Sequence, residues 1–274
     1  MSSFKLLRKT PWSARIGIGM VLLNVLVAIL APIISPYGET AVVGDVWMAP
    51  NKDHLLGTDH LGRDMLTRLI YGARNTIAIA TVTTLLAFIV GTIIGFFAAT
   101  LGGWTDLVLS RLIDILMSIP TLIFALMVLS VVGTGTGPLI GVISLLASTR
   151  VYRLSRAVAM DINVMEFVEA ARLRGERTWW LMRHEILPNG MPPLMAEFGL
   201  RFCFVFLFIA SLSFLGLGIH PPTADWGGMV RENSAAIAFG IITPLFPAGA
   251  IAFLTVGVNL IVDWFLHITS GLKD

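Results

Sequence analysis

Residues 75–105 read NTIAIATVTTLLAFIVGTIIGFFAATLGGWT and contain no charged side chain. A helix needs roughly 20 apolar residues to cross the hydrocarbon core of a bilayer, so this stretch is long enough to span a membrane. The rest of the chain is similar, because 56% of its 274 residues are apolar and 13% are charged, whereas soluble domains are about 25% charged. The composition excludes a soluble domain and a disordered chain, and it predicts an all-α polytopic membrane protein.

Other charge-free windows give the remaining spans. The window 115–149 is interrupted by GTGTGP at residues 133–138, which is turn chemistry, so we divide it between two helices. Arg150, Arg153 and Arg156 recur every three residues in the second of these, and that helix must leave the hydrocarbon there or lie against protein. We expect six transmembrane helices, at about residues 14–34, 76–101, 109–132, 138–158, 196–218 and 243–266.

The positions of Lys and Arg predict the orientation. With the N-terminus inside, 14 of the 19 basic residues fall in inner segments, among them Lys5, Arg8, Lys9 and Lys273, which follows the positive-inside rule. Both termini are then cytoplasmic. The chain divides into a cytoplasmic N-terminus with the first helix, an extracytoplasmic segment, and a five-helix core with a cytoplasmic loop at about 159–195; the three parts are residues 1–34, 35–74 and 75–274.

The sequence lacks the signatures of catalysis. No lysine follows a glycine, so the chain has no G-x-x-x-x-G-K-[ST] loop to hold nucleotide phosphates, and it has no G-x-S-x-G nucleophile elbow. His184-Glu185 begins a zinc motif, but Pro188 occupies the position of the second histidine. The single cysteine, Cys203, excludes an intrachain disulfide, and a net charge of +2 is too small to suggest a nucleic-acid surface. These features argue against an enzyme.

Metal binding and ion coupling receive little support. An outer cluster of potential ligands comprises His54, Asp59, His60 and Asp64. Its spacing matches no standard ligand pattern, so we interpret it as a polar loop without a metal. An ion-coupled carrier usually buries an acid near mid-membrane, whereas Asp114 and Asp263 lie near the inner ends of their predicted helices, and Asp114 can pair with Arg111. This weakens an ion-coupled secondary transporter but leaves it as an alternative.

The long inner loop predicts a helical hairpin. Asn163 and Glu166 are spaced as a capping box at a helix start, and Gly175 suits the position after a helix end. A second helix is expected at 178–187, where Pro188 ends it. The hairpin either rests on lipid headgroups or docks a cytoplasmic partner. A small apolar face at helical spacing comprises Val164, Phe167, Val168, Ala170 and Ala171.

Two local patterns concern helix packing. Gly91 and Gly95 form a G-x-x-x-G motif that would let another helix approach closely, although chance produces such a motif about as often in a glycine-rich membrane protein. The end of the outer segment, residues 64–74, places four apolar side chains on one stripe, which predicts an interfacial helix before the second span.

The inner loop carries, at fixed spacing, Glu169-Ala170-Ala171, Gly175 and Ile186-Leu187-Pro188. This pattern resembles the EAA loop of ABC-importer permeases. Residues 56–74, LGTDHLGRDMLTRLIYGAR, are similar to the outer signature of one subgroup, the peptide and nickel permeases, and so are residues 212–218, 221–223 and 226–227. The single predicted span before the long outer segment resembles the second permease subunit of that subgroup. The resemblance covers nearly the whole chain.

The resemblance implies a type I ABC importer permease fold and a non-catalytic subunit that forms half of a translocation pathway. It implies a second permease subunit, two ATPase subunits that bind ATP and Mg, an extracytoplasmic substrate-binding protein, and surrounding lipid in a bacterial or archaeal cytoplasmic membrane. No cofactor or nucleic acid is expected on this chain. The residues implied in ATPase coupling are Glu169, Ala170, Ala171, Arg172, Arg174, Gly175, Leu187 and Pro188. Peptides are the favoured solutes, and nickel chelates, glutathione and opine-like conjugates stay open.

Overall fold

The computed structural model describes residues 11–269. Lys5, Arg8, Lys9 and Lys273, which entered the predicted orientation, lie outside these residues. The regular secondary structure of the described chain is helical apart from two isolated β-bridges in the outer segment, so the all-α prediction is confirmed. A π-helical turn (Met182–Ile186) joins α8 to α9, and a 3₁₀ turn (Ser234–Phe239) follows α10. The helices are α2 (Trp12–Ile34), α3 (Met65–Leu101), α4 (Gly103–Ser118), α5 (Thr121–Val132), α6 (Thr136–Asn163), α7 (Glu166–Leu173), α8 (Thr178–Leu181), α9 (Leu187–Phe214), α10 (Trp226–Asn233) and α11 (Leu245–Thr269).

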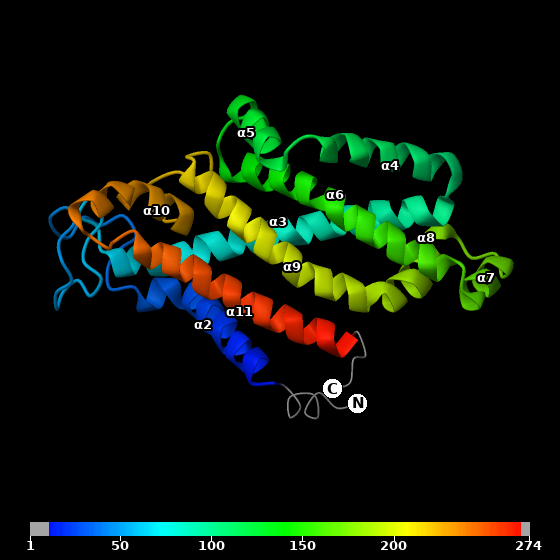
Figure 1. The fold of residues 1–274 in the computed structure, drawn as a ribbon, viewed down its shortest axis with the longest axis horizontal. Coiled ribbons are helices and arrows are strands. Elements are labelled where there is room, and N and C mark those ends of the chain that lie inside the picture. The colour runs from blue at the N-terminus through cyan, green and yellow to red at the C-terminus, as the bar shows by residue number, and fades with distance from the viewer. Residues whose placement is uncertain (1–10, 270–274) are drawn as a thin grey trace.

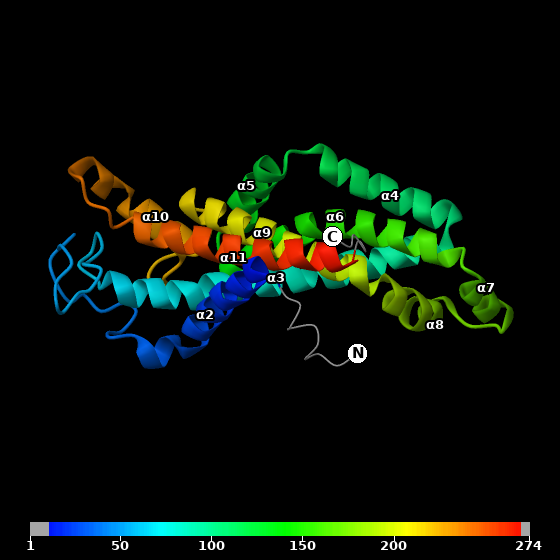
Figure 2. The same ribbon diagram turned by 60° about the horizontal axis from the view of Figure 1, so that its bottom comes forward.

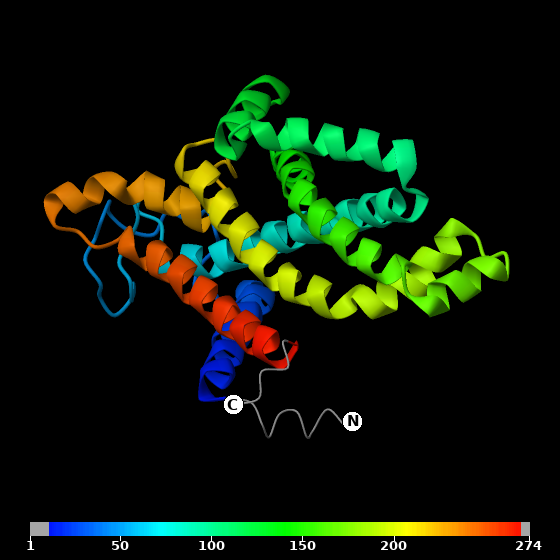
Figure 3. The ribbon, with the colours of Figure 1, turned by 45° about the vertical axis from the view of Figure 1, so that its right-hand side comes forward.

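The helices form an elongated bundle around α3 (Figure 1). Helices α6 and α9 pack on α3, while α2 and α11 pair along one side. Helices α4 and α5 stand apart on the opposite side, as the two rotated views also show (Figures 2 and 3). The outer segment and α10 lie at one end, and α7 and α8 lie at the other (Figure 1). The bundle therefore has two distinct ends joined by α3.

Within residues 11–269, four helices are long and apolar enough to cross a membrane: α2, α3, the continuous helix Thr178–Phe214 and α11. The expected third span, 109–132, is broken instead, because α4 and α5 meet at 88°. Pro120 explains the break, since the residue before a proline is held out of the helical region, and Ile119 is extended there. Helix α6 covers the expected fourth span and continues to Asn163. It carries Arg150, Arg153 and Arg156 and is not among the four helices named above.

Two expected helix boundaries were wrong. Helix α3 starts at Met65, with Asp64 capping it through a 2.7 Å bond from the Thr67 amide, so the predicted interfacial helix is the first part of a 37-residue helix. Pro188 does not end a helix either. Proline has no amide N–H to donate, and a π-helical turn lies directly before it. In this turn the Leu187 amide donates to the Met182 carbonyl five residues back, and the helix continues through Pro188. The turn predicted near residues 133–138 is confirmed between α5 and α6.

The predicted G-x-x-x-G motif lies at a close approach of two helices, α3 and α6. A Cβ at Gly91 would lie 2.7 Å from the Ser148 carbonyl oxygen, and one at Gly95 would lie 2.8 Å from the Tyr152 carbonyl oxygen. These distances are shorter than any van der Waals contact, so only glycine lets α3 lie this close to α6. Because lipid provides no hydrophobic drive for helix association, this packing holds α6 in the bundle.

We expect Gly91→Ala to weaken the α3–α6 contact, because overpacking of a close interface costs about 1–3 kcal/mol. The measurement is the melting temperature of the purified protein in detergent. Gly141→Ala is the matched control, since Gly141 lies in α6 with nothing within 4 Å of its Cβ position, and alanine there favours helix formation. A Gly91→Ala protein as stable as the Gly141→Ala protein would contradict this account of the contact.

Candidate functional site

Helix α7 projects from the end of the bundle opposite α10 and is anchored by two small side chains. Val168 and Ala171 are fully buried. They belong to an apolar cluster that joins α7 to α3, α6, α8 and the start of α9. The other cluster members are Phe96, Ala159, Ile162, Leu181, Met182, Ile186 and Leu194. The short helix is therefore packed against protein on one side and does not hang free.

The capping box predicted from Asn163 and Glu166 was wrong. Helix α7 has Met165 at its N-cap, without a side-chain cap, and Asn163 is the last residue of α6. The Asn163 side chain instead donates to the Ala99 carbonyl (3.0 Å) and accepts from Arg172 (3.1 Å). Asn163 thus ties the inner end of α3 to α7, a long-range role that local spacing could not indicate.

Gly175 ends α7 as predicted. Its φ is +86°, a region that L side chains rarely adopt. The Gly175 amide donates to the Arg172 carbonyl (2.9 Å), and the Glu176 amide donates to the Ala171 carbonyl (3.3 Å). This pair of bonds is a Schellman motif, which satisfies the last carbonyls of the helix and fixes the direction of the chain that follows.

Some of the predicted coupling residues lie on the side of the hairpin that packs against the bundle, and the others lie on its exposed side. Ala171 is buried and Leu187 is partly buried, so these two support the hairpin from within. Apolar side chains are exposed beside the charged ones, since Val164 is 83% and Leu173 is 84% exposed. Of the predicted apolar face, only Val168 and Ala171 face the bundle. The predicted coupling residues that are exposed are Glu169, Ala170, Arg172, Arg174, Gly175 and Pro188.

The sequence reasoning missed Trp179 and Trp180. Trp179 is 59% exposed, directly beside the glycine turn. The ring of Trp180 stacks on His184, with ring centroids 4.8 Å apart. A Trp pair in an otherwise basic inner segment was the available signal. The hairpin surface carries basic, acidic and large apolar groups together. Such a surface is more typical of a protein-binding site than of a surface exposed only to solvent.

The two outer stretches singled out by resemblance meet at the other end. The Trp226 indole donates to the Leu69 carbonyl (2.9 Å). Asp225 caps α10, accepting from the Gly228 amide (2.8 Å) and from the Thr76 hydroxyl (2.9 Å). Burial raises the pKa of Asp225 above its usual value. Two sequence segments about 150 residues apart therefore form one structural unit around the start of α3.

Among the candidate metal ligands of the outer segment, His54 pairs with Asp64 (3.1 Å), and Asp59 is engaged by arginines. Asp59 pairs with Arg63 (2.7 Å) and Arg68 (3.3 Å), and both arginines also reach Glu232 of α10 at 3.2 Å. Asp59, His60 and Glu232 lie close enough together to hold an ion. Two buried guanidinium groups on the same carboxylates disfavour a cation there. The cluster acts as an ionic link between the outer segment and α10.

A family model described as "Binding-protein-dependent transport system inner membrane component" matches residues 91–270. The chain belongs to this family. It is therefore a multi-pass, non-catalytic component of the inner membrane, and the predicted permease resemblance is confirmed. A binding-protein-dependent transport system implies ATPase and binding-protein partners.

Curated relatives of this family member are similar over most of their length. The dipeptide transport system permease protein DppC of Alkalihalophilus pseudofirmus is 32% identical, with 99% of this chain and 87% of the relative covered. The oligopeptide transport system permease protein OppC of Bacillus subtilis is 32% identical, with 95% and 84% covered. The glutathione transport system permease protein GsiD of Pectobacterium atrosepticum is 30% identical, with 82% and 72% covered.

Solved transporters share the fold. The chain is similar to the MetNI methionine ABC transporter in inward-facing conformations, with a TM-score of 0.60, 17% identity, and coverage of 77% of this chain and 98% of that one. It is also similar to an amino acid ABC transporter, with a TM-score of 0.52, 21% identity, and coverage of 73% and 93%. These likenesses establish an ABC importer permease fold.

We expect Gly175→Val to unwind the end of α7, because a β-branched residue at φ +86° is strained by about 1–2 kcal/mol. The measurement is amide hydrogen exchange of Gly175 and Glu176, or of the residues that replace them, in the purified protein. Gly175→Asn is the matched control, since asparagine tolerates positive φ and nothing lies within 4 Å of the Cβ position. Equal protection in both variants would contradict the role of backbone strain.

Proposed function

We propose that this chain is one of two permease subunits of a type I ABC importer for peptides or similar small solutes. A second permease of related fold completes the pathway, two ATPase subunits bind ATP and Mg, and an extracytoplasmic binding protein delivers the solute. The observation that carries the proposal is helix α7, which is anchored by Val168 and Ala171 and exposed on its other side. It lies at one end of a bundle whose other end is formed by the outer segment and α10, together called the outer cap. This arrangement gives separate surfaces to the ATPase and to the binding protein.

The proposal includes six spans with both termini cytoplasmic. The spans are α2, α3, the bent pair α4–α5, α6, the continuous helix Thr178–Phe214, and α11. Helix α6 can serve as a span although it carries three arginines, since Arg153 pairs with Asp114 of α4 (2.7 Å) and Arg156 pairs with Asp106. Paired charges that lie against protein cost far less in a membrane than free ones. The outer segment, residues 35–74, which includes the first part of α3, and α10 then face the binding protein.

Helix α7 is proposed as the coupling element. Force can pass through a short helix only if it is fixed to the bundle, and α7 is fixed by Val168, Ala171 and the Arg172–Asn163 bond. The exposed residues Glu169 and Arg174 are free to contact an ATPase surface. A movement of the ATPase would reach α3, α6 and α9 through the cluster beneath α7. This is the advantage of a packed helix over a hairpin that rests on lipid.

Peptides are proposed as the solutes because the relatives named above include dipeptide and oligopeptide permeases. Glutathione is a second candidate, supported by the likeness to a glutathione permease. Nickel chelates and opine-like conjugates rest on the subgroup resemblance alone. The family assignment leaves an ion-coupled secondary transporter without support.

The proposed topology predicts which positions react with a membrane-impermeant thiol reagent. In a Cys203→Ser background, we expect Lys52→Cys to be labelled in intact cells, because Lys52 is exposed in the outer segment. Val164→Cys, 83% exposed at the inner end, should be labelled only after the membrane is permeabilised. The reverse pattern would invert the topology.

The proposed activity predicts uptake into reconstituted vesicles that hold the full complex. We expect peptide uptake to require the binding protein and ATP, and an ion gradient without ATP to support none. Uptake driven by the gradient alone would contradict the importer.

In the same vesicles, Glu169→Lys should reduce uptake and loosen the ATPase, because it reverses a charge at the proposed contact. Glu166→Lys is the matched control. Both acids lie in the first turn of α7, where reversal loses a similar helix-dipole term of about 0.3–1 kcal/mol. Equal effects on uptake and on ATPase co-purification would assign the loss to the helix and not to the contact.

A further inference from the structure

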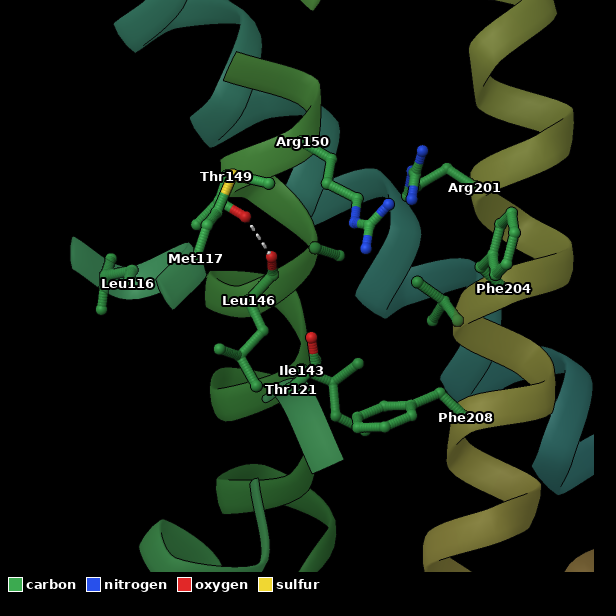
Figure 4. Close-up of a pocket in the computed structure, with 12 residues that line it drawn as sticks. Leu116, Met117, Thr121, Ile143, Leu146, Thr149, Arg150, Arg201, Phe204 and Phe208 are labelled. Atoms are coloured by element: carbon green, nitrogen blue, oxygen red, sulfur yellow. Dashed lines mark hydrogen bonds between the residues drawn. The ribbon is translucent and has the colours of Figure 1, made fainter. Parts of the chain in front are cut away.

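A cavity of about 180 Å³ lies between α6 and α9, beside the corner between α4 and α5 (Figure 4). Its walls are mostly apolar and include Ile143 from α6 and Phe208 from α9. The guanidinium groups of Arg150 and Arg201 extend into the same gap from opposite helices (Figure 4). Phe204 at the rim is 62% exposed and Arg150 is exposed as well, so the cavity is accessible from outside the subunit.

The cavity lies deep within the proposed membrane region. Gly91 of α3 touches α6 at Ser148 and Val151, which is the level of Arg150. Gly91 lies ten residues before the end of α3, about 15 Å along the helix, in the middle of the uncharged stretch 75–105. The predicted span 138–158 has its midpoint two residues before Arg150. The α3–α6 contact agrees, because it places Arg150 about halfway across a hydrocarbon core that is roughly 30 Å thick.

Arg150 differs from the other arginines of α6. Arg153 and Arg156 pair with Asp114 and Asp106 of α4. Within residues 11–269, no carboxylate lies within ion-pair distance of Arg150. A charged side chain at this depth without a partner is costly, and such groups mark solute or ion pathways.

Arg201 adds a second, buried cation. It is only 9% exposed and pairs with Glu197 one helical turn away, with its Nε at 3.0 Å from the carboxylate. Glu197 neutralises one of the two guanidinium groups, so the cavity keeps a net positive charge. The opposing arginines thus provide several N–H donors with one uncompensated charge in an apolar setting, which is the chemistry that recognises a carboxylate.

We propose that Arg150 and Arg201 form an anion site inside the translocation pathway, which holds the carboxylate of the solute while its apolar part lies along the walls formed by Ile143 and Phe208. This inference rests on the proposed function and adds a chemical requirement to it. The site is suited to brief occupancy, because Arg150 is exposed and Glu197 competes for Arg201. A site that bound more tightly would retain the solute instead of passing it on.

The position of the cavity favours a solute over a lipid headgroup. Headgroups occupy the membrane boundaries, whereas Arg150 lies about halfway along the membrane-embedded part of α6. An acidic side chain of the second permease could reach the same arginines, and co-purification of the two permeases tests that alternative.

The test compares a peptide that ends in a free carboxylate with the same peptide as its C-terminal amide, in vesicles that contain the complete transporter. The quantity measured is the ratio of the two uptake rates at saturating binding protein. Because the binding protein is the same throughout, a change in the ratio between variants reports the permease. We expect Arg150→Gln to lower the carboxylate-to-amide ratio about tenfold, the size of a lost charged hydrogen bond. Arg201→Gln should act in the same direction.

Arg150→Lys keeps the charge and should retain part of the preference. Arg153→Gln is the matched control, since Arg153 lies on the same helix, pairs with Asp114 and does not line the cavity. Its ratio should equal that of the wild type. An unchanged ratio in Arg150→Gln, or equal loss of both peptides in the Lys and Gln variants, would overturn the anion site while leaving the importer intact.

Two further readouts separate the other occupants. If the effect of Arg150→Gln occurs only in vesicles with phosphatidylglycerol and not in pure phosphatidylcholine, a lipid headgroup occupies the cavity and the proposal is wrong. If Arg150→Gln prevents co-purification of the second permease, the arginine holds a partner side chain and the proposal is also wrong. Absence of ATP-driven peptide uptake by the wild-type complex would overturn the proposed function, and this inference with it.

Discussion

The close crossing of α3 and α6 is the contact on which the arrangement depends. Two glycines one turn apart, Gly91 and Gly95, bring the α3 backbone against the carbonyls of Ser148 and Tyr152. Packing of this kind is the main source of helix association in lipid, where apolar side chains gain nothing from leaving water. It also places the helix that carries three arginines against protein along most of its length.

The crossing also sets the environment of each arginine. Along α6, Tyr152 meets Ser110 of α4 with 2.9 Å between their hydroxyls, and Arg156 and Arg153 meet Asp106 and Asp114. The expected pair between Arg111 and Asp114 is replaced by the pair across two helices. None of the residues of α4 is buried, so these polar contacts are the main ties between α4 and α6. Arg150, one turn further along, lacks such a tie and faces the cavity.

Helix α3 links the two ends of the molecule as a single rigid element. At the outer end, Thr76 and Leu69 bond to Asp225 and Trp226. At the inner end, the Ala99 carbonyl accepts from Asn163. The outer cap and the inner hairpin are therefore both attached to the same helix of about 55 Å. In a transporter, this geometry holds the two partner surfaces at a fixed separation.

The sequence by itself determined the features that depend on neighbours along the chain. Uncharged windows located the first, second and last spans, because membrane crossing requires apolar length and little else. The glycine after α7 was predicted for a local reason as well, since only glycine readily adopts the φ of +86° found at Gly175. The same holds for the turn near Gly133, where α5 ends and the chain reverses into α6. In each case the interactions that determine the local structure involve residues close together in the sequence.

The tertiary structure decided the features that depend on partners far along the chain. Pro188 was expected to end a helix, but a π-helical turn and the packing of Ile186 and Met182 carry the helix through it. Asn163 was assigned to a cap, but the carbonyl of Ala99 lies close enough to take its side chain. The placement of Arg150 opposite Arg201 across a cavity had no signal in the sequence, because they lie on different helices. A charge in a membrane is governed by what surrounds it in three dimensions, and only the packing of α6 between α3, α4 and α9 fixes those surroundings.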